Sequence, residues 1–189
     1  MSEPRFIVAR TFNLPIDNVD TDQIYPGRYL TTTQRDGLGD LCFYDWRHDH
    51  ATGKKALFEG FDPDSQSILV AGDNFGCGSS REHAAWALLD MGFKAVISTS
   101  FPDIFASNAA KNGLVLVTAE QPVLDFLYLH NRKQLTISVA DRTLVVPGLG
   151  IFPFEIDEFT AYCLLHSIDA LDYLMNQESR IEAYEKSGI

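Results

Sequence analysis

The sequence is short of the residues that several functional classes require. Its three cysteines, Cys42, Cys77 and Cys163, are odd in number and far apart, which favours free thiols in a reducing compartment over a disulfide framework. The chain has no Cys-x-x-Cys pair and no cluster of cysteine and histidine, so we expect it to hold no iron–sulfur cluster alone. No stretch approaches the roughly 18 apolar residues that a membrane-spanning helix needs.

Positive charge is also scarce. The chain has 15 Lys and Arg against 26 Asp and Glu, a formal net charge of −11. This balance opposes nucleic-acid binding, which depends on cations that neutralise phosphates. A few arginines gathered in a cleft can still attract a small anion. Residues 1–5 lack the start of a signal peptide, so we expect a cytoplasmic protein with no membrane partner.

The most informative segment is the run at residues 73–83, Asp-Asn-Phe-Gly-Cys-Gly-Ser-Ser-Arg-Glu-His. It lies between an apolar stretch at 67–71 and a helical pattern. A strand, a Gly-rich turn and a helix N-terminus aim backbone N–H groups at one point, and such a point binds anions. Arg81 adds a guanidinium suited to a carboxylate or phosphate, and Ser79 and Ser80 add hydroxyls. The spacing fits neither the phosphate loop nor the dinucleotide fingerprint.

The same run also has a purely structural interpretation. Ser79 and Glu82 have the Ser-x-x-Glu spacing of a capping box, in which Ser79 caps the following helix and Glu82 completes the box. From spacing alone, capping and catalysis are equally good interpretations of Ser79.

Hydrophobic patterning predicts strands and helices that alternate within one domain over residues 1–189. Strands are expected near 6–12, 67–71, 94–99, 114–117, 135–139, 143–146 and 151–156. Helices are expected near 80–91, 101–112 and 121–130, and again over about 157–187. Gly92 and Gly113 are the predicted helix stops, and Asp157 and Asn176 the predicted N-caps. Residues 13–66 form a loop-rich segment that is too long for a plain connection, which makes it a candidate functional region.

Four ordered blocks resemble a known family. They are residues 18–26, 44–47, 74–84 and 100–108, and the likeness runs from about residue 10 to residues 181–185. Together they resemble the swivelling domain of the aconitase superfamily, in the form found in the small-subunit family of 3-isopropylmalate dehydratases. The fold class that this implies is α/β, a β/β/α swivelling domain with a mixed, barrel-like sheet.

The resemblance also implies an activity. Members of this family isomerise a 2-hydroxy diacid or triacid by dehydration and rehydration, as in the conversion of 2-isopropylmalate to 3-isopropylmalate in leucine biosynthesis. The resemblance implies a [4Fe–4S] cluster on a large partner subunit, with no cofactor or metal on this chain. By the matching motif, Ser79 is the catalytic base, and Ser80 and Arg81 contact the carboxylates of the small-molecule substrate.

The choice of substrate depends on the loop at residues 27–32. In this family the loop helps to recognise the group that differs between substrates, which we call the variable arm. Relatives that select a longer tricarboxylate carry arginine at the position of Thr31, so Thr31 favours an uncharged arm. Arg28 fits a substrate contact and a surface position equally well. Two alternatives stay open: a paralogous subunit acting on another malate, of the citraconate, methylmalate or dimethylmalate type, and a non-catalytic anion-binding regulatory domain. The intact Ser79-Ser80-Arg81 disfavours the second, because a regulator needs no base.

Overall fold

The computed structural model describes residues 6–31, 35–48, 54–168 and 170–186. Its strands are β1 (Phe6–Leu14), β2 (Ile68–Ala71), β3 (Ala95–Ser98), β4 (Val115–Thr118), β5 (Gln134–Ser138), β6 (Thr143–Val146) and β7 (Gly150–Pro153). Its α-helices are α1 (Thr21–Ile24), α2 (Tyr44–His48), α3 (Glu82–Asp90), α4 (Asp103–Asn112), α5 (Gln121–Leu129), α6 (Glu158–His166), α7 (Ala170–Met175) and α8 (Glu178–Lys186). Short 3₁₀ helices cover Gly27–Tyr29, Gly39–Leu41 and Lys54–Phe58.

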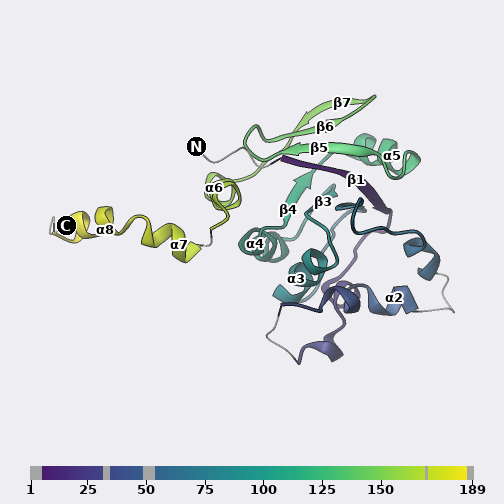
Figure 1. Cartoon of the computed structure of the whole chain (residues 1–189), viewed down its shortest axis with the longest axis horizontal. Coiled ribbons are helices and arrows are strands. Elements are labelled where there is room, and N and C mark those ends of the chain that lie inside the picture. Colours follow the sequence, from purple (N-terminus) through teal and green to yellow (C-terminus); the bar gives the residue numbers. More distant parts are fainter. Residues whose placement is uncertain (1–5, 32–34, 49–53, 169, 187–189) are drawn as a thin grey trace.

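A mixed sheet organises the described residues. Its seven strands follow the order β4-β3-β2-β1-β5-β6-β7 (Figure 1). Strands β1 to β4 pair in parallel, while β5, β6 and β7 form antiparallel ladders. The long strand β1 joins the two halves, because Phe6–Arg10 pair with β5 and Thr11–Leu14 pair with β2. The expected mixed α/β sheet is confirmed, and β5 and β6 form an antiparallel hairpin within it.

Both faces of the parallel strands are covered, which explains why β2 and β3 are buried along their whole length. Leu69 and Val96 belong to an apolar core that includes Leu88 of α3. Their neighbours in sequence point the other way, and Ile68 belongs to a second core with Leu124 of α5. Figure 1 shows α3 and α4 on one side of the parallel strands. The sheet therefore holds the loops at its strand ends on a rigid base.

Most helix boundaries follow from local sequence signals. Asp157 caps α6, as predicted, by accepting a hydrogen bond of 2.9 Å from the Thr160 N–H. The hydrogen bonds of this cap lower the pKa of the Asp157 carboxyl. Gly92 and Gly113 follow α3 and α4 with φ of 108° and 82°, which confirms them as helix stops.

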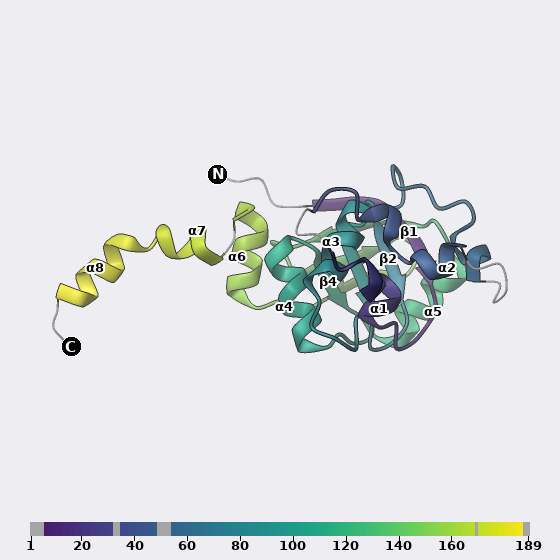
Figure 2. The ribbon, with the colours of Figure 1, turned by 90° about the horizontal axis from the view of Figure 1, so that it is seen from below.

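The last part of the chain differs from its prediction. Asn176 does not cap the final helix, because α8 begins at Glu178 and the N–H groups of Arg180 and Ile181 donate to the Gln177 carbonyl. A last helix that starts near residue 176 was predicted, but the separate helix α7 before it was not. These two helices extend away from the sheet (Figures 1 and 2). None of the helices in the described segments is long and apolar enough to span a bilayer.

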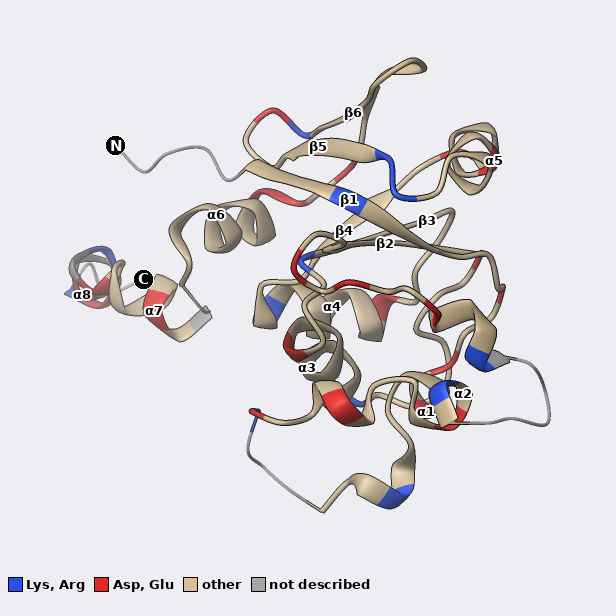
Figure 3. Ribbon diagram, turned by 45° about the vertical axis from the view of Figure 1, so that its right-hand side comes forward, with Lys and Arg blue, Asp and Glu red and all other residues tan. Residues whose placement is uncertain are grey.

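Acidic residues outnumber basic residues on most parts of the fold. Figure 3 shows Asp and Glu spread over helices and loops, with fewer Lys and Arg between them. Two arginines near the Gly-rich run are ion-paired with such carboxylates, Arg81 with Asp22 and Arg28 with Asp45.

Candidate active site

Three parallel strands deliver the predicted site residues to one edge of the sheet. Strands β1, β2 and β3 end at Leu14, Ala71 and Ser98, and the loops that follow them meet there. This is the edge at which open α/β sheets bind their ligands.

Asp73 ties these loops together. Its carboxylate accepts hydrogen bonds of 2.6 Å from both the Ser100 and the Thr99 hydroxyls, and its backbone carbonyl accepts one of 2.8 Å from the Asn18 N–H. The bonds from Ser100 and Thr99 lower the pKa of the Asp73 carboxyl, so it stays ionised at neutral pH.

Residues 74–81, which we term the signature turn, are anchored to residues 18–21. The Gly76 N–H donates to the Val19 carbonyl at 2.7 Å, and the Thr21 N–H donates to the Cys77 carbonyl at 2.8 Å. The hydroxyl of Thr21, which is buried, donates to the Ser79 carbonyl at 2.9 Å. Two blocks that are more than fifty residues apart in sequence thus form one unit, and the position of Ser79 is fixed through its backbone.

Gly76 permits this geometry for a steric reason. Its φ is +83°, and a Cβ there would lie 2.3 Å from the Cγ of Phe105, which is buried beneath the turn. Gly78 also has a positive φ, of 90°. No other residue type fits the turn at Gly76 without moving α4.

Gly76→Ala is therefore expected to destabilise the chain by about 2–5 kcal/mol, the sum of a left-handed backbone and an overpacked contact. Gly37→Ala is the matched control, because Gly37 has φ of +82° and nothing within 4 Å of its added Cβ. The control should lose only about 1 kcal/mol. Urea unfolding of both variants measures the difference, and equal losses would show that Phe105 does not constrain the turn.

Ser79 is not the cap of α3, so the capping-box interpretation is wrong. The helix begins at Glu82, and the residue at its N-cap is Arg81, whose side chain makes no capping bond. Glu82 is at the first helical position, and its carboxylate accepts a hydrogen bond of 2.8 Å from Asn112. Arg81 has extended dihedrals, φ −103° and ψ 117°, which keep residues 79–81 outside the helix. The side chains of Ser79 and Ser80 are exposed just before the first amides of α3.

Arg81 is held beside these serines by Asp22. The Arg81 guanidinium forms an ion pair with the Asp22 carboxylate, and the same carboxylate oxygen accepts a 3.0 Å hydrogen bond from the Gly27 N–H. A Cβ on Gly27 would lie 3.2 Å from one terminal nitrogen of Arg81. The Arg81 side chain is only 21% exposed, so its orientation is restricted. Sequence reasoning assigned no role to Asp22, although it lies within a recognised block.

Arg28 and Thr31 lie on the adjoining loop, which the structure describes as far as Thr31. Arg28 forms a two-point ion pair with Asp45 of α2, so its head group is directed toward α2. The hydrogen bonds that Arg28 donates to Asp45 raise the pKa of the Arg28 guanidinium further. Thr31 is exposed, and its N–H donates to the Tyr29 carbonyl at 2.7 Å.

Tyr25 connects this loop to α3. Its hydroxyl donates to the Tyr29 carbonyl at 3.0 Å, and its ring stacks on His83 at a centroid distance of 5.7 Å. Burial raises the pKa of the Tyr25 hydroxyl, so the group stays a donor. His83 also contacts the Trp86 ring, at 4.6 Å. These contacts give His83 a packing role between the loop and the helix.

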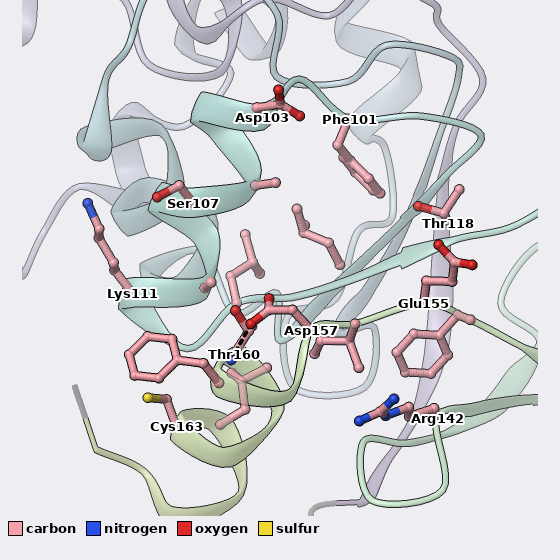
Figure 4. A pocket seen from close by; sticks show the side chains of 18 of the residues that line it. Phe101, Asp103, Ser107, Lys111, Thr118, Arg142, Glu155, Asp157, Thr160 and Cys163 are labelled. Carbon is pink, nitrogen blue, oxygen red and sulfur yellow. Dashed lines mark hydrogen bonds between the residues drawn. The ribbon is translucent and has the colours of Figure 1, made fainter. Parts of the chain in front are cut away.

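One cavity of the described structure is separate from the signature turn. It has a volume of about 910 Å³, and residues of α4, α6 and the segment after β7 line it (Figure 4). Phe101, Phe154 and Phe159 form apolar walls, while Asp103 and Lys111 are among its polar residues. Ser79, Ser80 and Arg81 are not part of this lining. Gly78, Ser79 and Ser80 of the signature turn are instead exposed at the surface.

Metal ligands are not gathered in the described part of the chain. Residues 6–31, 35–48, 54–168 and 170–186 contain no group of three or more His, Cys, Asp or Glu that could hold a metal ion. Cys42, Cys77 and Cys163 form no disulfide bond in the described structure. Burial raises the pKa of the Cys77 thiol, which disfavours the thiolate that metals bind.

Comparison with known proteins gives consistent results. Residues 7–122 match the model of the aconitase C-terminal domain. The chain is 47% identical to the 3-isopropylmalate dehydratase small subunit of Roseiflexus sp. (strain RS-1), over 96% of this chain and 92% of that one. It is 46% identical to the 3-isopropylmalate dehydratase small subunit of Anaeromyxobacter dehalogenans (strain 2CP-1), over 98% of both chains.

A solved structure agrees with these relatives. The crystal structure of a 3-isopropylmalate dehydratase from Methanocaldococcus jannaschii superposes with a TM-score of 0.70 and 28% sequence identity. The match covers 96% of this chain and 99% of that chain.

Proposed function

This chain belongs to the small-subunit family of 3-isopropylmalate dehydratases, within the wider family of the aconitase C-terminal domain, and from that premise we propose its reaction. The chain is the small subunit of a hydro-lyase that interconverts 2-isopropylmalate and 3-isopropylmalate, a step of leucine biosynthesis. It acts in the cytoplasm with a large subunit. The observation that carries this proposal is the signature turn, where Ser79, Ser80 and the Asp22-held Arg81 lie together before α3.

Ser79 is the base in this proposal. Dehydration removes a proton from the carbon next to the hydroxyl-bearing carbon, and the Ser79 alkoxide accepts that proton. Rehydration with the opposite regiochemistry returns a proton to the substrate. A serine alkoxide needs stabilisation, which the first N–H groups of α3 and the charge of Arg81 supply at close range. The hydrogen bond from the Thr21 hydroxyl to the Ser79 carbonyl holds the backbone of Ser79 in place during both steps.

Arg81 and Ser80 bind the carboxylates of the substrate. The guanidinium has donors on both edges, so it can keep its ion pair with Asp22 and donate to a substrate carboxylate as well. Ser80 is exposed beside it and offers one further donor. These contacts orient the carbon that loses its proton toward Ser79.

The large subunit supplies the remaining chemistry. We propose that it carries a [4Fe–4S] cluster, which when bound acts as a Lewis acid on the departing hydroxyl. The signature turn lies open on this chain, so the partner would close the site and exclude water from it.

The variable arm of the substrate is proposed to contact the loop that ends at Thr31. Thr31 is exposed and uncharged, which suits an alkyl arm. A shorter methylated malate remains the alternative substrate, because threonine is not strongly apolar.

The isolated chain is expected to be colourless and inactive, and to become active when it is co-purified anaerobically with the large subunit. Activity should be measured with 2-isopropylmalate, citraconate and a homoaconitate-type substrate, and we expect the first to have the highest kcat/KM. A brown isolated chain with hydratase activity would contradict the two-subunit proposal. Binding of dicarboxylates by a complex that turns over none of them would favour a regulatory anion-binding domain.

A further inference from the structure

Arg28 and Asp45 form a closed two-point ion pair at the edge of the active-site loop. One terminal nitrogen of Arg28 donates to Asp45 Oδ2 at 2.9 Å, and the other contacts Asp45 Oδ1. The guanidinium also lies 4.7 Å from the centroid of the Tyr29 ring and 5.7 Å from that of Tyr44. The two rings meet edge to face at 5.3 Å. Arg28 is thus held against α2 by a carboxylate and two aromatic rings.

This pair lies next to the residues that bind the substrate carboxylate in our proposal. Gly27 precedes Arg28 directly, donates to Asp22 and packs against the Arg81 guanidinium. Tyr29 follows Arg28, and its carbonyl accepts the Tyr25 hydroxyl bond. The loop that carries Arg28 is therefore fixed to the signature turn on one side and to α2 on the other.

A contribution to folding stability does not explain why Arg28 and Asp45 are paired. The side chains of Arg28 and Asp45 are 50% and 54% exposed, and ion pairs at such sites contribute little to folding. The pair has a clear electrostatic effect instead. An unpaired arginine on this loop would offer the edge formed by its two terminal nitrogens to a carboxylate, whereas Asp45 already occupies that edge and offsets the charge.

We infer that Asp45 is a positioning residue that sets substrate selectivity by holding and neutralising Arg28. With Asp45 in place, the loop presents no free arginine fork to the variable arm, so an uncharged arm is favoured over one that ends in a carboxylate. This inference rests on the proposed function, and it assigns α2 a role in selecting the substrate.

The test is Asp45→Asn in the complex with the large subunit, assayed with an alkylmalate and with a homologue whose arm ends in a carboxylate. The ratio of kcat/KM for the carboxylate arm to kcat/KM for the alkyl arm should rise about tenfold or more, because the Arg28 fork becomes available. The change should come mainly from a lower KM for the carboxylate arm. The melting temperature of the free subunit should not change.

Two further variants separate selectivity from damage. Glu182→Gln is the matched control, since it breaks an exposed ion pair of 2.9 Å with Lys186 on α8, and its ratio should equal that of the wild type. The double variant Arg28→Gln with Asp45→Asn should return the ratio to the wild-type value, because the released cation is gone. A raised ratio that persists in the double variant would overturn the inference.

If the wild-type complex turns over its alkylmalate and Asp45→Asn leaves the ratio of kcat/KM values unchanged, the role of Asp45 is overturned but the proposed function is not. A wild-type complex that turns over neither substrate would overturn the proposed function, and the inference with it.

Discussion

Ser79→Ala is expected to lower kcat by a factor of about 10² to 10⁴, the usual contribution of a positioned general base. The substituted methyl group cannot accept the proton, whereas the hydrogen bond from the Thr21 hydroxyl to the backbone carbonyl at position 79 remains. Because the side chain of Ser79 does not cap α3, the melting temperature should stay the same. Steady-state kinetics of the reconstituted complex, with thermal unfolding of the free subunit, measures both quantities.

Ser107→Ala is the matched control for this prediction. Ser107 is an exposed serine on α4, away from the signature turn, and its loss should leave kcat unchanged. If Ser79→Ala keeps the wild-type kcat, Ser79 is not the base. If it lowers the melting temperature instead, the hydroxyl has a structural role that the hydrogen bonds of the turn do not reveal.

Arg81→Lys is expected to lower kcat/KM by about 10- to 100-fold, mainly through a higher KM. In the proposed site the guanidinium bonds Asp22 and a substrate carboxylate at the same time, and a lysine ammonium is a single point that cannot keep both planar contacts. The net charge is unchanged, so the loss reports geometry rather than electrostatic attraction. The measurement is the substrate dependence of the rate in the reconstituted complex.

Arg180→Lys provides the control for this substitution. Arg180 is an exposed arginine on α8 that donates to Gln177 at 2.9 Å, so its kinetics should match the wild type. A KM for Arg81→Lys within the range of this control would show that Arg81 does not bind the substrate carboxylate. The ion pair with Asp22 would then be structural only.

The sheet and most of its helices could be predicted because their signals are local. The apolar runs at 68–71 and 95–98, and the stops at Gly92 and Gly113, each depend on neighbouring residues alone. The start of α3 could not be predicted in this way. The Ser-x-x-Glu spacing fits a capping box, but the positive φ of Gly78 and the bond from Thr21 keep Ser79 outside the helix.

The partners within the site also depend on tertiary structure. The resemblance indicated Ser79, Ser80 and Arg81, whereas Asp22 and Asp45 gain their roles from contacts across 59 and 17 residues of sequence. The parallel pairing of β1 and β2 creates the first of these contacts, and the fold of the loop-rich segment creates the second. Neither contact has a signal in the spacing of the residues.

The central claim is that Ser79 on this chain removes the substrate proton. Loss of label from a deuterated substrate tests this claim most directly. The reconstituted complex is given an alkylmalate deuterated at the carbon that loses its proton, and the label is followed by NMR. The wild-type complex should remove the label from that carbon at the rate of turnover. Ser79→Ala should bind the substrate with an unchanged Kd and keep the label on that carbon. Loss of the label from that carbon in Ser79→Ala at the wild-type rate would contradict the account.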